Sequence, residues 1–163
     1  MSPDFREEAE LELALLKQLF QEYGPLLDTA QRARPDKNEV IALAAVLHSF
    51  YTGTENLFTR ILAGQGRAVL KSAFWHKELL TSVAMAKGRY AAVISPLLHD
   101  KLKYYLDFRH AFRQSYGFRL KWEKMAPLVF ECREVLALLE KEVRQHLSAS
   151  GARTKKNGPR KKR

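Results

Sequence analysis

The sequence predicts an all-α protein, an up-and-down bundle of about five helices. Along residues 1–147 apolar side chains recur three or four positions apart, as on one face of a helix, and they never alternate strictly as in a half-buried strand. The connections between these segments are short and contain Gly or Pro. Helices joined by short connections pack beside one another, so we expect one helical domain over residues 1–147.

The periodic segments place the five helices at about residues 5–27, 43–61, 74–85, 96–116 and 129–146. The first is expected to bend at Gly24-Pro25, because proline lacks the backbone N–H that a helix interior uses. Ser95 is a favourable N-cap with Pro96 at the first helical position, and Gly117 follows the end of that helix. Trp122 and Met125 form the approach to the last helix.

Residues 148–163 are predicted to form a disordered basic tail. The net charge of the chain is +10, and seven Lys or Arg residues without any acid lie in residues 151–163, which leaves only +3 for residues 1–150. The tail has no apolar face, so it gains nothing by packing. It can bind phosphate backbones through residues such as Lys155 and Lys156, or it can be a solubilising terminus without a specific partner.

Several classes of protein are excluded on composition. An apolar share of 46% with 28% charged residues is that of a globular protein, and charged residues interrupt every apolar run before it reaches the length of a membrane span. The acidic N-terminus does not resemble a signal peptide, so we expect a cytoplasmic protein without a membrane partner.

No metal or cofactor is expected. The single cysteine, Cys132, allows neither an intramolecular disulfide nor a zinc site built from paired cysteines. The five histidines lack the i, i+4 pairing of a helical zinc site. Gly64-Gln65-Gly66 is an isolated glycine motif in a helical context, without the lysine of a P-loop.

Arg109 occupies a position on the apolar face of the fourth predicted helix, between Tyr105 and Phe112. A guanidinium cannot lose its charge, and burying it unpaired is costly. Arg109 is therefore expected to meet an acid, a polar groove or a bound anion. The simplest alternative is a structural ion pair, for instance with Glu55 of the second helix.

A second pattern continues along the same helix. Arg113 follows Arg109 by one turn, and Tyr116 would lie about 20° round the helix from Arg109. Two guanidiniums and a phenol on one face can bind a phosphodiester and stack against a nucleotide. The alternative is that Arg113 points into water while Tyr116 packs in the core.

At these residues the chain resembles the HepT-like branch of the HEPN superfamily, which includes ribonuclease toxins of toxin-antitoxin pairs. The resemblance covers about residues 7–147. It is carried by LHSFYTGTENLFTRIL at 47–62, by WHKELL at 75–80, and above all by FRHAFRQSYGF followed by LKWEKM. The family motif is an arginine beside a polar residue, then a histidine a few positions later, followed in this branch by x-Tyr.

The motif maps onto Arg109 with His110 as the adjacent polar residue, and onto Tyr116 as the tyrosine. Gln114 stands where the family has histidine. The resemblance implies a homodimer whose motif helices form a shared RNA-cleaving cleft. It also implies a nucleotidyltransferase antitoxin that adenylylates Tyr116. Glutamine cannot transfer protons near neutral pH, so His110 would have to substitute as the acid or base.

Three interpretations remain open from the sequence. The first is a metal-independent ribonuclease in which Arg109 contacts the scissile phosphate, His110 or Gln114 handles protons, and Arg113 and the tail bind RNA. The second is a catalytically inactive RNA-binding or partner-binding module, because of Gln114. The third is a purely structural bundle in which Arg109 forms a salt bridge.

Overall fold

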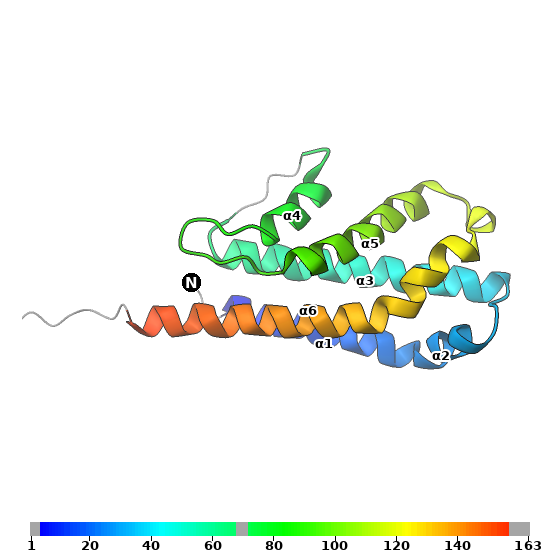
Figure 1. The fold of residues 1–163 in the computed structure, drawn as a ribbon, viewed down its shortest axis with the longest axis horizontal. Helices are drawn as coiled ribbons and strands as arrows, with labels where there is room; N and C mark the ends of the chain where they lie inside the picture. Colours follow the sequence, from blue (N-terminus) through cyan, green and yellow to red (C-terminus); the bar gives the residue numbers. More distant parts are fainter. Residues whose placement is uncertain (1–3, 68–71, 157–163) are drawn as a thin grey trace, which may run out of the picture.

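The computed structural model describes residues 4–67 and 72–156 and confirms the all-α fold class (Figure 1). Within these residues no β-strand forms, and a single isolated bridge joins Lys87 to Tyr90. The helices are α1 (Asp4–Glu22), α2 (Gly24–Arg32), α3 (Lys37–Gly64), α4 (Trp75–Val83), α5 (Pro96–Gln114) and α6 (Trp122–Lys156), with a short 3₁₀ turn, η1 (Gly117–Arg119), before α6.

The long helices run alternately up and down the molecule. In Figure 1, α1 and α5 run in one direction while α3 and α6 return in the other. The central element is α3, which contacts α1 on one side, α4 and α5 on the other, and α6. The predicted up-and-down bundle is therefore confirmed, with α4 lying beside one end of α3 and α5.

Two helix starts are fixed by side chains. Asp36 accepts a hydrogen bond from the backbone N–H of Glu39 at 2.8 Å, and the Glu39 carboxylate accepts one from the N–H of Asp36, which completes a capping box before α3. Ser95 caps α5 as the sequence predicts, accepting from the N–H of Leu98 at 3.2 Å. The hydroxyl of Ser95 also donates to Glu142 at 2.6 Å, which ties the start of α5 to α6.

The bend expected near Gly24-Pro25 is a full break at Tyr23, so the chain has six α-helices in its described part where the sequence indicates about five. Pro25 has no N–H to donate, and the helix resumes as α2. The last helix starts at Trp122, earlier than expected, and encloses Pro127. Figure 1 shows α6 bending near its yellow start, as proline within a helix causes.

The structure describes only the first part of the predicted basic tail. The backbone of α6 is helical to Lys156, so the first part of the tail, including the backbone of Lys155 and Lys156, belongs to this helix. Residues 157–163 lie outside the described residues.

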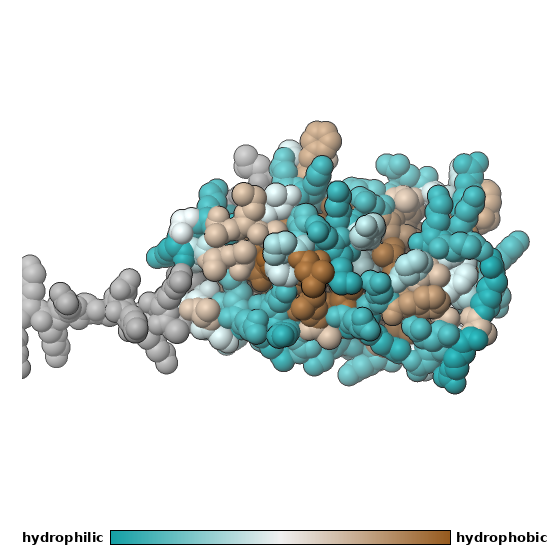
Figure 2. Space-filling model, in the orientation of Figure 1, coloured by the Kyte–Doolittle hydropathy of each residue, from teal (hydrophilic) through white to brown (hydrophobic). Residues whose placement is uncertain are grey.

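The core lies where α1, α3, α5 and α6 face each other. Phe50 is fully buried at its centre, with the rings of Phe20 and Tyr105 each 5.2 Å away. The face drawn in Figure 2 is mainly hydrophilic, with separate apolar groups between charged side chains. None of the helices within the described residues is both long and apolar enough to cross a membrane.

Candidate functional site

Three helices bring an acid, an imidazole and a guanidinium together in the interior. Glu55 of α3 is 3% exposed and Arg109 of α5 is 8% exposed. The Nε of Arg109 lies 3.3 Å from Oε1 of Glu55. The other carboxylate oxygen of Glu55 accepts a short hydrogen bond from Nδ1 of His76, in the first turn of α4. The structure thus contains the ion pair between Arg109 and Glu55 that the sequence left open as an alternative.

A third contact in this cluster joins Arg109 to His76. Nη1 of Arg109 lies 3.4 Å from Nε2 of His76, and it can donate to that nitrogen when Nδ1 carries the imidazole proton. The N–H of Arg109 Nε finds no acceptor at a hydrogen-bonding angle among the described residues, so its attraction to Glu55 is ionic. Glu55 therefore compensates the charge of Arg109 and fixes the ring of His76 at the same time.

The charges of this cluster act on the neighbouring titratable groups of α3. Burial and the negative charge of Glu55 raise the pKa of Tyr51 far above its ordinary value. Burial, helped by the charges of Arg109 and Arg113, lowers the pKa of His48. Tyr51 is therefore a neutral phenol and His48 a neutral imidazole at physiological pH.

His110 lies on the outer side of the cluster. Its side chain is exposed, and its ring meets that of His76 edge to face with centroids 5.6 Å apart. The ring of Trp75 also packs against that of His76, with centroids 3.8 Å apart. The exposed ring of His110 therefore adjoins the nearly buried His76 and Arg109 where α4 meets α5. Such a set can take up a proton, release another and neutralise an anion.

The remaining motif residues do not share the face that the helical wheel predicts. α5 ends at Gln114, and Tyr116 has extended backbone angles outside the helix (φ −69°, ψ 142°). Tyr116 is 70% exposed, so neither its expected alignment with Arg109 nor its alternative place in the core is correct. Arg113 and Gln114 are exposed.

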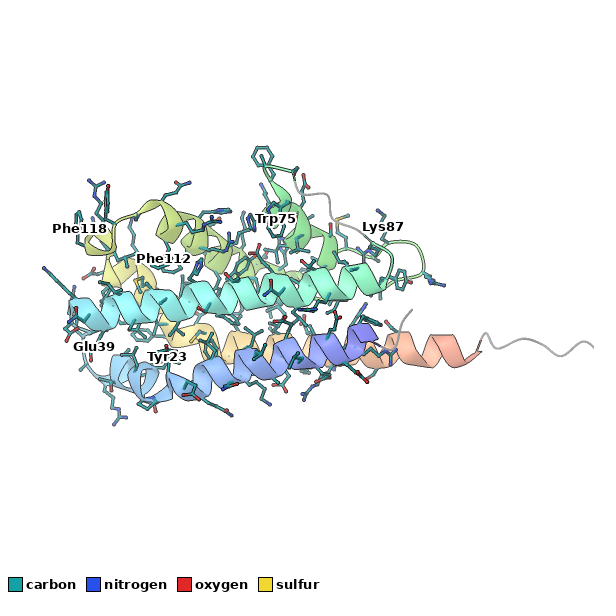
Figure 3. The ribbon with its side chains drawn as sticks, turned by 180° about the vertical axis from the view of Figure 1, so that it is seen from behind. Tyr23, Glu39, Trp75, Lys87, Phe112 and Phe118 are labelled. Carbon is teal, nitrogen blue, oxygen red and sulfur yellow. The ribbon has the colours of Figure 1, made fainter. Side chains whose placement is uncertain are left out.

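This difference follows from the point at which α5 ends. Gly117 begins the η1 turn and approaches Ile41 of α3, where an added Cβ would lie 3.4 Å from Cδ1 of Ile41. Ser115 and Tyr116 already have extended backbone angles, so Tyr116 does not follow the helical periodicity from Arg109, and its ring stacks on Phe118. Figure 3 places Phe118 at the end of the molecule, beyond Phe112 of α5.

His76 is the functional candidate that sequence reasoning missed, since each histidine was judged separately. One available signal was Glu55, an acid among the buried residues of α3 four positions after Tyr51. A buried acid requires more than one polar partner, and a histidine after an aromatic residue at a helix start is a suitable one. Among the described residues, no three His, Cys, Asp or Glu side chains are grouped so that they could hold a metal ion.

The family comparison agrees with the resemblance drawn from the motif residues. A family model described as HepT-like protein matches residues 42–150, which is more than half of the chain and includes most of α3, all of α4 and α5, and most of α6. No curated protein and no solved structure matches the chain significantly. The helical bundle and this match agree: the chain belongs to the HepT-like family.

Proposed function

We propose that this protein is a HEPN-type toxin of the cytoplasm, a metal-independent endoribonuclease that acts as a homodimer. The observation that carries the proposal is the adjacency of His110, His76 and Arg109, with the two imidazole centroids 5.6 Å apart. An imidazole pair can supply the acid and the base that Gln114 cannot supply.

In the proposed reaction one imidazole removes the proton of an RNA 2′-hydroxyl. The 2′-oxygen then attacks the adjacent phosphorus, and the bond from phosphorus to the 5′-oxygen breaks. The other imidazole, in its protonated form, gives its proton to the leaving 5′-oxygen, so that the products are a 2′,3′-cyclic phosphate and a 5′-hydroxyl. The guanidinium of Arg109 stabilises the charge of the pentacoordinate phosphorane.

The roles of the other residues follow from their positions. Glu55 holds the His76 ring through Nδ1, which leaves Nε2 directed toward Arg109 and the site. Arg113 and Gln114 lie exposed near the end of α5, where they can contact RNA and orient a phosphate. We assign additional RNA affinity to Lys155 and Lys156, as charges near the basic terminus.

The same proposal includes control by adenylylation of Tyr116. The phenol is 70% exposed, so a nucleotidyltransferase antitoxin can reach its hydroxyl. An adenylate on Tyr116 would add negative charge and bulk where RNA has to enter. Mass spectrometry after incubation with such an antitoxin and ATP tests this part directly, and an unmodified Tyr116 contradicts it.

The decisive variant is His110→Gln, because His110 is exposed and its replacement leaves the core intact. We expect purified wild type to cleave RNA at a rate unaffected by EDTA, and His110→Gln to be roughly 100-fold slower or more. His99→Gln, at the start of the same helix, is the matched control and should retain the wild-type rate. If wild type binds RNA but cleaves none at any protein concentration, the ribonuclease proposal is wrong.

Two observations favour a second candidate, a catalytically inactive RNA-binding module. Gln114 stands at the family's histidine position, and Glu55 already compensates the charge of Arg109. This candidate predicts that Gln114→His creates cleavage that wild type lacks. The ribonuclease proposal predicts that Gln114→His changes the wild-type rate only slightly.

A further inference from the structure

Tyr116 and Phe118 form an exposed aromatic pair on the segment between α5 and α6. Their rings are nearly parallel, with an interplanar angle of 10° and centroids 5.5 Å apart. Tyr116 is 70% exposed and Phe118 is 78% exposed. Two large apolar rings held parallel in water are unusual for a surface that has no binding partner.

A groove of about 580 Å³ adjoins this pair. Its lining includes Arg34, Lys37, Ile41, Phe118, Lys121 and Trp122, from the start of α3, the η1 turn and the start of α6. The lining therefore combines the aromatic side chains of Phe118 and Trp122 with basic side chains.

The charge of this groove is positive. Arg34 pairs with Glu123 of the lining at 2.5 Å, so these two charges compensate each other. Lys37 and Lys121, together with the nearby Arg119, form no ion pair with any residue that the structure describes. A ligand with flat apolar rings and negative charges fits this combination. An uncharged hydrophobic peptide does not, because it would leave the cations without partners.

We propose that the Tyr116–Phe118 pair and the groove beside it bind single-stranded RNA, with a base stacked on the aromatic pair and its phosphates held by Lys37, Arg119 and Lys121. Aromatic rings stack on any base whose face is free, whereas a duplex hides its bases between their neighbours. This inference rests on the proposed function, because it specifies that the RNA substrate is single-stranded.

The Tyr116–Phe118 pair lies close enough to the candidate active site for one RNA strand to contact both. Four helical steps and two extended steps along the chain lead from His110 to Tyr116, so their Cα atoms are at most about 13 Å apart. In Figure 3, Phe118 lies at the end of the molecule, while Trp75 marks the α4 side of the active site. A strand bound across Arg113 would reach both places.

The test is a binding measurement that does not depend on cleavage. Fluorescence anisotropy with a labelled single-stranded RNA and a labelled RNA duplex is carried out on His110→Gln, which we expect to bind without cutting. We expect tighter binding of the single strand. Phe118→Ala in this background should weaken single-strand binding roughly 5- to 150-fold. Tyr23→Ala removes another exposed aromatic ring, 45% exposed between α1 and α2, and should leave binding unchanged.

Two results overturn the inference. One is unchanged single-strand affinity in Phe118→Ala, whose exposed ring can be removed without harm to the fold. The other is a dimer that dissociates in Phe118→Ala, measured by light scattering, while affinity per folded chain stays the same; the pair would then be an interface between copies. A wild type that binds single strands through Phe118 but never cleaves contradicts the ribonuclease proposal alone.

Discussion

The Nε of Arg109 lies 3.3 Å from Oε1 of Glu55, and both side chains are almost completely removed from solvent. Arg109 therefore serves the fold as well as the candidate site. Its guanidinium is held by an acid from another helix, and the same acid positions His76. The stability of the bundle and the geometry of the proposed active site depend on one carboxylate.

We expect Glu55→Gln to lower the free energy of unfolding by about 3–5 kcal/mol, because it leaves the buried charge of Arg109 without compensation. Replacing both members, in Glu55→Gln with Arg109→Met, should recover much of this loss. The measurement is chemical denaturation. Glu10→Gln, which breaks the exposed pair of Glu10 with Arg144, is the control and should cost less than about 1 kcal/mol. Equal losses of unfolding free energy in Glu55→Gln and Glu10→Gln would show that the buried pair stabilises the fold no more than an exposed one.

We expect the stability of the fold to depend on pH through His146 of α6. Burial and the charge of Arg67 lower the pKa of His146, while its hydrogen bond to the backbone carbonyl of Ala92 partly opposes this shift. The folded state therefore holds His146 neutral, and its ring can accept from the Gln65 amide at 2.6 Å. A depressed pKa means that its contribution to stability is complete above the unfolded value of 6.5 and is lost as pH falls below it.

The melting temperature of wild type should accordingly fall between about pH 7.5 and about pH 5.5. His146→Gln should make this part of the curve flatter, although it lowers stability at neutral pH. His99→Gln, at a half-buried position of α5, should keep the wild-type slope. An unchanged slope in His146→Gln would exclude His146 as its source.

Cys132 should resist thiol reagents in the folded protein. It is fully buried in α6, and burial raises its pKa to about 11, so that the reactive thiolate is scarce near neutral pH. A colorimetric thiol assay should give no signal until denaturant is added. Ser49→Cys, on the exposed side of α3, should add one thiol that reacts at once. Fast labelling of wild type would mean that α6 opens readily.

Gly64→Ala should destabilise the protein more than Gly53→Ala, although both lie in α3. A Cβ at Gly64 would come within 2.3 Å of Cγ of Phe5 and 2.7 Å of its Cβ, so the whole buried side chain would have to move. At Gly53 the nearest atom, at 2.6 Å, is the flexible tip of Leu16. We expect losses of roughly 1–3 kcal/mol at Gly64, measured by thermal unfolding. The opposite order would contradict the packing of α1 on α3.

Local patterns in the sequence were sufficient for the helical class, for the start of α5 at Ser95-Pro96 and for the interruption at Gly24-Pro25. Apolar spacing, caps and proline act over a few residues, so a linear reading captures them. The unusual position of Arg109 was also visible, because an apolar face has a simple periodicity. The same patterns placed the end of α5 two residues late, because Tyr116 continues the apolar spacing of the helix although Ser115 and Tyr116 have extended backbone angles.

The sequence by itself determined the helical class, the approximate positions of most helices, and that Arg109 must meet an acid, a polar groove or a bound anion. Only the tertiary structure decided that Glu55 and His76 are the groups beside it, and that Tyr116 stands exposed on Phe118. The physical reason is that periodicity fixes which face of a helix is buried, whereas the partners on that face depend on how separate helices pack. His76 lies 33 residues from Arg109, and no local signal connects them.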